Sequence, residues 1–230
     1  MPTVNRSGRP TRSDGEDCRR ALVDAARSIA ATDGFSRVTM RQVANAAGVS
    51  PGLAFHYFAT RDELVAESFE TAANDDLSAM RAVIAQHDDP LRQLWALLHV
   101  YAPLTPTNRR SYLMWLDAWA EAVRSPSMRA ATQRVTANWE QMVTDIVAAG
   151  CRSGVFHHAE PKHAAWRITA AIDGLAIQAA LNDSFPRSQL ITWARQSCVE
   201  MLHLPAEALT MDVPIRRNRG HRRTSSRLTI

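Results

Sequence analysis

The sequence predicts an all-α fold, with a small N-terminal helical domain followed by a longer helical bundle. Apolar residues recur at three- and four-residue spacing along most of the chain, and no segment shows sustained alternation of apolar and polar residues. Glycine and proline are few, at 9 and 11 of 230 residues, and most prolines stand between the apolar-periodic segments. Long helices separated by short breaks explain both observations.

The first helix is expected over residues 17–33, because its apolar residues share one face. These are Ala21, Leu22, Ala25, Ala26, Ile29 and Ala30. Gly34 follows in the position where helices commonly end. Thr39, with Gln42 three residues later, forms a capping box that opens a second helix. That helix is short, since Gly48 comes soon after it.

A third helix begins after Ser50, whose hydroxyl is a favourable N-cap, with Pro51 in the first position. Thr60 and Glu63 form a second capping box, which opens a long helix to about residue 85. A short helix, a glycine turn and another short helix constitute the helix-turn-helix arrangement. The head of this protein is therefore predicted to be a helix-turn-helix domain.

The third helix, within "VSPGLAFHYF" at residues 49–58, suits entry into the DNA major groove. Gly52 has no side chain to hold DNA away, and Leu53 can meet thymine methyl groups. His56 and Tyr57 can donate to phosphate oxygens. A capped interior turn without a ligand is the alternative interpretation. Two phenylalanines of the stretch are expected to anchor the small core with four other residues: Phe55 and Phe58 with Phe35, Val38, Val43 and Leu64.

The charge distribution favours nucleic-acid contact at the chain's ends. Residues 1–61 carry nine arginines and five acidic residues, and residues 214–230 carry six arginines and no acidic residue. The region between them holds twelve basic and eighteen acidic residues. We expect a disordered basic arm over residues 1–15 and a disordered Arg-rich tail over 211–230. The arm could reach a minor groove or have no role, through Arg6, Arg9 and Arg12.

Five further helices are expected between proline or glycine breaks. They span residues 90–102, 107–124, 126–152, 161–183 and 187–203. The segment "MWLDAWAEAV" is apolar on more than one face, which indicates a helix enclosed within a bundle.

The segment "GFSRVTMRQVANAAGVSPGLAFHYFATRDEL" closely resembles the DNA-binding domain of TetR-family transcriptional repressors. The resemblance implies a head over residues 16–64 and a ligand-binding and dimerisation domain over residues 65–210. Pro51 and Phe55 stand where Lys and Tyr are frequent in the family, so a relative's operator sequence does not carry over. By motif position, nine residues would face DNA: Thr39, Arg41, Ser50, Pro51, Gly52, Leu53, His56, Tyr57 and Arg61.

Residues 112–183 resemble the C-terminal domain of the BetI-type branch, which includes regulators responsive to choline. That resemblance implies a dimer in which the last two major helices of each subunit form a four-helix bundle. Small residues at four-residue spacing would let the helices approach closely. The expected interface comprises Ala170, Gly174 and Gln178 on one helix, and Leu190, Trp193, Ser197 and Leu204 on the next.

An aromatic ligand site is predicted in the bundle, either for an amine cation held by ring faces or for a flat neutral molecule. Six rings are candidates: Trp95, Tyr112, Trp115, Trp119, Trp139 and Trp166. Asp173 or Asp117 could supply the counter-charge, but Asp117 projects from the opposite side of its helix to Trp115 and Trp119.

No metal, cofactor or catalytic site is predicted. The segment "HHAEPKH", with His157, His158, Glu160 and His163, has no zinc-ligand spacing and is expected to be a surface loop. No nucleophile elbow, phosphate-binding loop or metalloprotease motif occurs. The three distant cysteines, the polar N-terminus and the lack of a long apolar run indicate a cytoplasmic protein without a membrane span. The predicted DNA binding would make it nucleoid-associated.

These expectations combine into one functional hypothesis. The protein would be a homodimeric repressor that binds pseudo-palindromic double-stranded DNA and is released by a small-molecule inducer, an amine or an aromatic compound. The alternative is a helical small-molecule sensor or protein-interaction module without DNA binding.

Overall fold

The computed structural model describes residues 12–157 and 160–210, and this part of the chain is helical throughout, without strands. The helices run α1 Arg12–Asp33, α2 Met40–Ala46, α3 Pro51–Tyr57, α4 Arg61–Ile84, α5 Pro90–Tyr101, α6 Pro106–Ala122, α7 Pro126–Arg152, α8 Pro161–Leu181 and α9 Leu190–Leu202. Three short 3-10 helices interrupt them: η1 Phe35–Arg37, η2 Arg187–Gln189 and η3 Ala206–Thr210. The all-α prediction is confirmed.

Two boundaries differ from the sequence prediction. The first helix begins at Arg12, so residues 12–15, which were expected in a disordered arm, are helical. The segment predicted as one helix over 187–203 is η2 followed by α9. The remainder of the predicted arm, with Arg6 and Arg9, and the predicted tail lie outside the described residues.

The predicted caps determine where the short helices of the head begin. The Thr39 hydroxyl accepts a hydrogen bond from Gln42 N, and the Gln42 side chain accepts one from Thr39 N at 3.0 Å, a complete capping box. In the second predicted box, Thr60 accepts from Glu63 N, but the Glu63 carboxylate accepts from Ala59 N at 3.0 Å. These local bonds satisfy backbone donors that the first turn of a helix leaves free.

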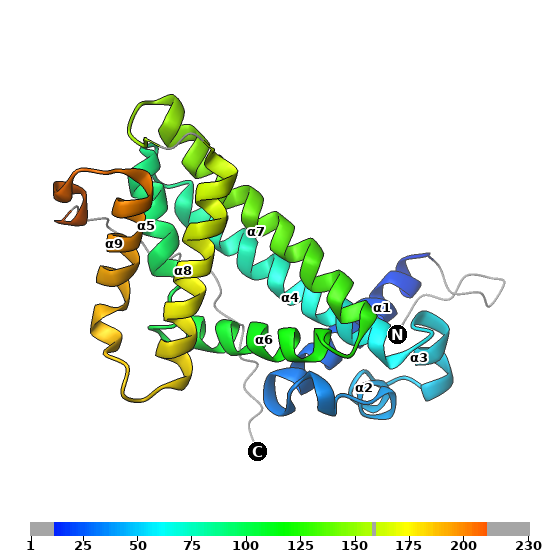
Figure 1. The fold of residues 1–230 in the computed structure, drawn as a ribbon. Helices are drawn as coiled ribbons and strands as arrows, with labels where there is room; N and C mark the ends of the chain where they lie inside the picture. The colour runs from blue at the N-terminus through cyan, green and yellow to red at the C-terminus, as the bar shows by residue number, and fades with distance from the viewer. Residues whose placement is uncertain (1–11, 158–159, 211–230) are drawn as a thin grey trace, which may run out of the picture.

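The head, α1 to α3, encloses a small core at one end of the molecule (Figure 1). Gly48 has φ 70° in the turn between α2 and α3, a conformation that favours glycine. Phe58 is 1% exposed and belongs to the core, as predicted, but Phe55 is 52% exposed. The prediction that both rings anchor the core was therefore wrong for Phe55, because α3 turns that side chain outward.

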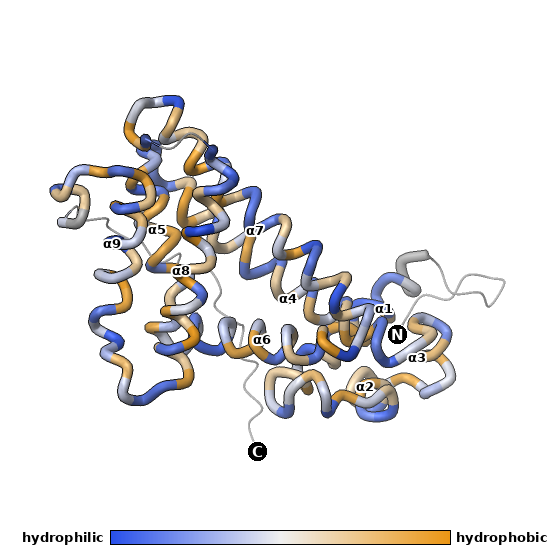
Figure 2. Tube along the Cα trace, viewed as in Figure 1, coloured by the Kyte–Doolittle hydropathy of each residue, from blue (hydrophilic) through white to orange (hydrophobic). Residues whose placement is uncertain are grey.

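The bundle is organised around the two long helices α4 and α7, which pack against each other and extend away from the head (Figure 1). α8 and α9 lie at the far side of α7, and α5 packs between α4, α7 and α9. Figure 2 shows hydrophilic and hydrophobic segments alternating along α4 and α7, as expected of helices with one face in the core. α6 crosses the molecule and brings its C-terminal half against the head.

One hydrophobic core runs continuously from the head into the bundle. Leu22 of α1, Phe69 of α4 and Val143 of α7 are all buried and belong to the same cluster. The head is therefore anchored to the bundle through α4, which contributes to both parts.

Candidate functional site

The N-terminal turn of α3 is open to solvent. Ser50 caps it, its hydroxyl accepting from Leu53 N at 3.2 Å. Leu53 is 39% exposed, and a Cβ on Gly52 would meet nothing within 4 Å. Seven of the nine predicted DNA-facing residues are exposed: Thr39, Arg41, Ser50, Pro51, Gly52, Leu53 and His56. These residues form a surface on α2 and α3 that can approach another macromolecule closely.

The C-terminal end of α3 is tied to the rest of the head. Tyr57 is half-buried, and its ring meets that of His56 edge to face at 5.4 Å between centroids. The Arg19 guanidinium of α1 donates to Tyr57 O at 3.0 Å, pairs with Glu67 of α4, and lies over the Phe58 ring. Since one arginine bonds α3 to two neighbouring helices, the angle at which α3 projects is fixed.

Arg61, predicted to contact a phosphate, instead bridges the head and α6. Its Nε donates to Val38 O at 3.0 Å, its Nη1 donates to Glu121 Oε1 at 2.7 Å, and its Nη2 donates to Phe35 O. Burial lowers the pKa of Arg61, but the hydrogen bonds to Glu121 and Asp62 outweigh burial and raise it. This placement disfavours the predicted phosphate contact, because all three guanidinium nitrogens already donate within the protein.

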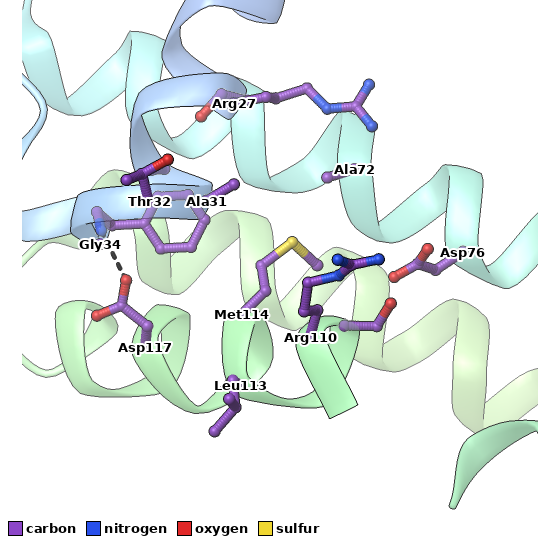
Figure 3. A pocket seen from close by; sticks show the side chains of 14 residues that line it. Arg27, Ala31, Thr32, Gly34, Ala72, Asp76, Arg110, Leu113, Met114 and Asp117 are labelled. Carbon is purple, nitrogen blue, oxygen red and sulfur yellow. Dashed lines mark hydrogen bonds between the residues drawn. The ribbon is translucent and has the colours of Figure 1, made fainter. Parts of the chain in front are cut away.

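A second contact joins α6 to the head. The Asp117 carboxylate accepts from Phe35 N at 2.6 Å, the bond drawn as a dashed line in Figure 3. Gly34 has φ 85°, and a Cβ there would lie 3.2 Å from Asp117 Oδ2, so this approach requires glycine. The Asp117 carboxylate therefore bonds the head and does not face an aromatic site. This agrees with the sequence prediction that Asp117 projects from the opposite side of its helix to Trp115 and Trp119.

An aromatic cluster lies between α5, α6, α7 and α8. The Tyr101 ring lies 4.6 Å from the Trp139 ring and 5.7 Å from the Tyr112 ring, measured between centroids. The Tyr101 hydroxyl donates to the Asp173 carboxylate, and the Tyr112 hydroxyl donates to Asp173 O at 3.1 Å. Trp139 Nε1 donates to Thr169 Oγ1 at 3.1 Å. The three rings are thus packed together next to Asp173, and Tyr101 bonds its carboxylate directly.

The electrostatics of this cluster centre on Asp173. Burial raises the pKa of its carboxyl group, and the hydrogen bond from Tyr101 acts in the opposite direction. Burial and the charge of Asp173 raise the pKa of Tyr101 well above its ordinary value, so Tyr101 remains a donor. A desolvated carboxylate among aromatic faces is a suitable environment for an organic cation.

The cluster contains three of the predicted ligand residues, Tyr112, Trp139 and Asp173, and one residue that the sequence analysis missed. Tyr101 is the last residue of α5, just before a predicted break, where periodicity does not show which way a side chain points. A buried tyrosine hydroxyl usually has a hydrogen-bond partner, and this general rule was the one indication in the sequence that Tyr101 could contact a polar group.

The other four predicted rings lie elsewhere. Trp95 is fully buried, and its Nε1 donates to Ala208 O at 3.1 Å, so it is a core residue. Trp115 packs edge to face on Phe69 at 5.0 Å, and Trp119 lies against Trp115. Trp166 is 57% exposed on α8. The structure therefore does not bring these four into one site with Asp173.

The predicted interface residues of α8 form an exposed stripe. Ala170, Gly174 and Gln178 are all exposed at four-residue spacing. On α9, Trp193 is exposed and Ser197 is half-buried. Two predicted residues are instead interior: Leu190, which packs with Ala102 and Ala179, and Leu204. Leu190 was misassigned because it begins α9 and points back toward α8.

The described residues contain no group of three or more His, Cys, Asp or Glu side chains arranged to hold a metal ion. In the predicted surface loop, His163 Nδ1 lies 3.8 Å from Glu160 Oε2, and both side chains are exposed. His158 lies outside the described residues. Within the two described segments, no helix has the length and apolarity needed to span a membrane.

A helix-turn-helix head joined to a larger helical bundle is an architecture of DNA-binding regulators. Residues 22–68 match the family model described as "Bacterial regulatory proteins, tetR family", and residues 90–203 match "BetI-type transcriptional repressor, C-terminal". The chain belongs to the TetR family of transcriptional regulators, with a BetI-type C-terminal half. Members of this family are regulators and not enzymes.

Curated relatives agree with this assignment. The chain is 29% identical over 170 residues to the HTH-type transcriptional regulator BetI of Rhizobium meliloti, covering 72% of this chain and 79% of the relative. The BetI of Agrobacterium fabrum is 33% identical over 111 residues, covering 48% and 54%.

Solved structures share the fold. A transcriptional regulator from Rhodococcus sp. Rha1 superposes with a TM-score of 0.67 at 24% identity, over 80% of this chain and 96% of the other. A putative regulator from Saccharomonospora viridis, solved in complex with choline, gives 0.68 at 21% identity, also over 80% and 96%.

The raised pKa of Asp173 predicts a pH-dependent stability. Because the folded state disfavours the ionised carboxyl, stability is highest below the unfolded pKa and falls as pH rises toward the folded pKa. Replacing it by Asp173→Asn should remove this loss, so that the variant gains stability relative to wild type as pH rises from about 3 to 7. Urea denaturation across that range measures the difference, with the exposed Asp88→Asn as control. A constant difference between variant and wild type at all pH values would contradict the prediction.

Proposed function

We propose that the protein is a homodimeric repressor that binds a pseudo-palindromic operator through α2 and α3 and is released by an organic cation. The observation that carries the proposal is the exposed, Ser-capped N-terminal turn of α3, beside an exposed Arg41. Under this proposal the protein acts in the cytoplasm on nucleoid DNA. The head comprises residues 16–64, and the ligand-binding and dimerisation domain comprises residues 65–210.

The contacts with DNA are divided between bases and phosphates. Gly52 lets the backbone approach, while the exposed Leu53 and Phe55 offer apolar surface to thymine methyl groups and sugars. Arg41 and His56 are exposed donors suited to phosphates. Phe55 does not pack in the core, and contact with DNA would account for its exposed position.

Dimerisation is proposed through the outer faces of α8 and α9. In the exposed stripe of Ala170, Gly174 and Gln178, the first two residues are small and permit close helix packing, and the exposed Trp193 of α9 adds apolar surface. Two heads related by a two-fold axis would enter major grooves about one helical turn apart or a multiple of that distance.

The inducer is proposed to occupy the aromatic cluster around Asp173. The Tyr101 hydroxyl now donates to that carboxylate, and a cation would compensate its charge more fully. The partly desolvated carboxylate favours a cation over the flat neutral molecule that the sequence left open. The choline complex of the Saccharomonospora viridis regulator, which has the same fold, supports this ligand class.

α6 is proposed to transmit the signal. Tyr112 of the aromatic cluster, and Asp117 and Glu121 at the head, all lie on this one helix. A ligand that rotates or shifts α6 would move both attachments to the head together. The inducer acts because it binds unequally to the two arrangements.

The alternative function, a sensor or interaction module without DNA binding, leaves the exposed surface of α2 and α3 without a purpose. The helix-turn-helix family match argues against it as well.

Removing the Arg41 charge should weaken operator binding and reduce its salt dependence. Arg41→Ala is expected to lower the slope of log affinity against log salt concentration by about 1, because one phosphate contact is lost. Fluorescence anisotropy with the DNA upstream of the protein's own gene measures this. The matched control is Arg92→Ala, which removes an exposed arginine from α5 in the bundle. Equal affinities and slopes for both variants would argue against the proposed DNA surface.

A charge on the α8 stripe should separate the dimer. Ala170→Glu places a carboxylate at an exposed position that the two-fold axis would bring near its own copy, whereas Ala137→Glu places one on an exposed position of α7. Sedimentation velocity should show monomer for Ala170→Glu and dimer for Ala137→Glu and wild type. A wild-type monomer, or a dimeric Ala170→Glu variant, would reject this interface.

Choline should bind wild type and quench tryptophan fluorescence, since Trp139 lies in the cluster. Asp173→Asn should weaken choline binding about tenfold or more, because a charge-assisted contact is worth roughly 1.5–3 kcal/mol. An uncharged carbon isostere of choline should bind wild type and variant equally. Unchanged choline affinity in Asp173→Asn would exclude the cation site.

A further inference from the structure

A separate cavity of about 450 Å³ lies where the head meets the bundle, between α1, α4 and α6 (Figure 3). Its lining does not include Tyr101, Tyr112, Trp139 or Asp173, so it is distinct from the proposed inducer site. The volume falls within the range of roughly 300–1,000 Å³ found for small-molecule sites.

The middle of the cavity is apolar. Ala30 comes from α1, Ala72 from α4 and Met114 from α6, with Phe35 from η1. Ser68 lies beneath them, but its hydroxyl already donates to Val65 O at 2.7 Å. The central walls therefore suit a hydrocarbon group, and the Ser68 hydroxyl has no proton left to donate to a ligand.

The two ends are polar and differ in what they can bind. At one end, Asp117 is already bound to Phe35 N beside Gly34. At the other end, Figure 3 shows Asp76 of α4 and Arg110 of α6 pointing toward each other, yet no ion pair joins these two described side chains. Arg27 contributes its charge nearby but forms an ion pair with Asp75 at 2.9 Å. One acid and one base are thus available at the same end.

The carboxyl group of Asp76 is partly desolvated. Burial raises its pKa, while a hydrogen bond with Ser111 acts in the opposite direction. A cationic group placed against Asp76 and Ser111 would satisfy this carboxylate, and an anionic group would satisfy the exposed Arg110.

The charge balance of the lining selects a ligand without net charge. Arg27 pairs with Asp75 and Asp117 is bound to Phe35 N, so Asp76 and Arg110 are the two groups left to meet a ligand, and an ion of either sign would satisfy only one of them. A zwitterion with an apolar body meets each requirement: an ammonium group for Asp76, a carboxylate for Arg110 and a hydrocarbon side chain between Ala30, Ala72 and Met114.

We propose that this cavity is a second small-molecule site, and that it takes a zwitterion with an apolar side chain, such as an aromatic amino acid. The cavity is bounded by α1 of the head and α6 of the bundle, next to the Asp117 contact that joins them. A molecule bound there holds these two helices at one separation. The site thereby senses a ligand independently of the aromatic cluster.

Isothermal titration calorimetry of the full chain, without DNA, tests the proposal with three related probes. Phenylalanine carries both charges, phenethylamine carries only the cation, and hydrocinnamate carries only the anion. Phenylalanine should bind. Each single-charge analogue should bind with an affinity about tenfold lower, or lower still, since one charge-assisted contact is lost. Absence of phenylalanine binding, or equal binding of either analogue, would overturn the proposal.

Variants locate the binding. Asp76→Asn and the exposed Arg110→Gln should each weaken phenylalanine binding about tenfold, and Ala72→Leu should abolish it by filling the cavity. Asp173→Asn should leave phenylalanine binding unchanged, which separates this site from the proposed inducer site. Circular dichroism verifies that each variant is folded, and Arg110→Gln, at an exposed position, provides the test should Asp76→Asn not fold. Wild-type affinity in folded Arg110→Gln and Ala72→Leu would reject the site.

Discussion

Two carboxylates on α6 bind the head at its junction with the bundle, beside the hydrophobic core that the head shares with α4, and the proposed transmission of the signal depends on them. Asp117 accepts from Phe35 N, and four residues later Glu121 accepts from Arg61. Glu121 is 8% exposed, and separating it from Arg61 would leave this buried carboxylate only the longer ion pair with the exposed Arg124, at 3.6 Å. The head therefore cannot move away from α6 at low cost, and a displacement of α6 is passed on to it.

The same helix reaches the aromatic cluster. Tyr112 and Glu121 are nine residues apart on α6, about 14 Å along the axis. A helix of this length moves as a unit. A displacement at Tyr112 therefore also displaces Glu121, and no series of side-chain contacts is needed between them. The junction cavity lies along the same helix, between Arg110 and Asp117. One element thus borders both proposed ligand sites and bonds to the DNA-binding head.

The sequence predicted the parts of this fold that local chemistry decides. The Thr39–Gln42 box, the Ser50 cap and the turn at Gly48 each depend on residues within a few positions, and all are present in the structure. The outward direction of Phe55 could not be predicted, because it depends on which face of a seven-residue helix packs against the rest of the head.

Contacts between distant segments could not be predicted from the sequence either, because they too depend on how the helices pack. Arg61 and Glu121 are sixty residues apart, and Tyr101 and Asp173 are seventy-two apart. Neither pair has a spacing that marks it, so Arg61 was assigned to DNA by its motif position and Tyr101 was not identified. A motif gives the position of a residue in a family pattern, whereas the partners of its side chain are determined by packing.

The most direct measurement is the effect of choline on operator binding when the α6 attachments are removed. Operator affinity is measured with and without saturating choline, in wild type and in an Asp117→Ala, Glu121→Ala double variant. If α6 carries the signal, choline weakens operator binding by wild type, whereas the double variant binds both ligands but its operator affinity no longer responds to choline. Release of the operator by choline to the same extent in the double variant would contradict the account.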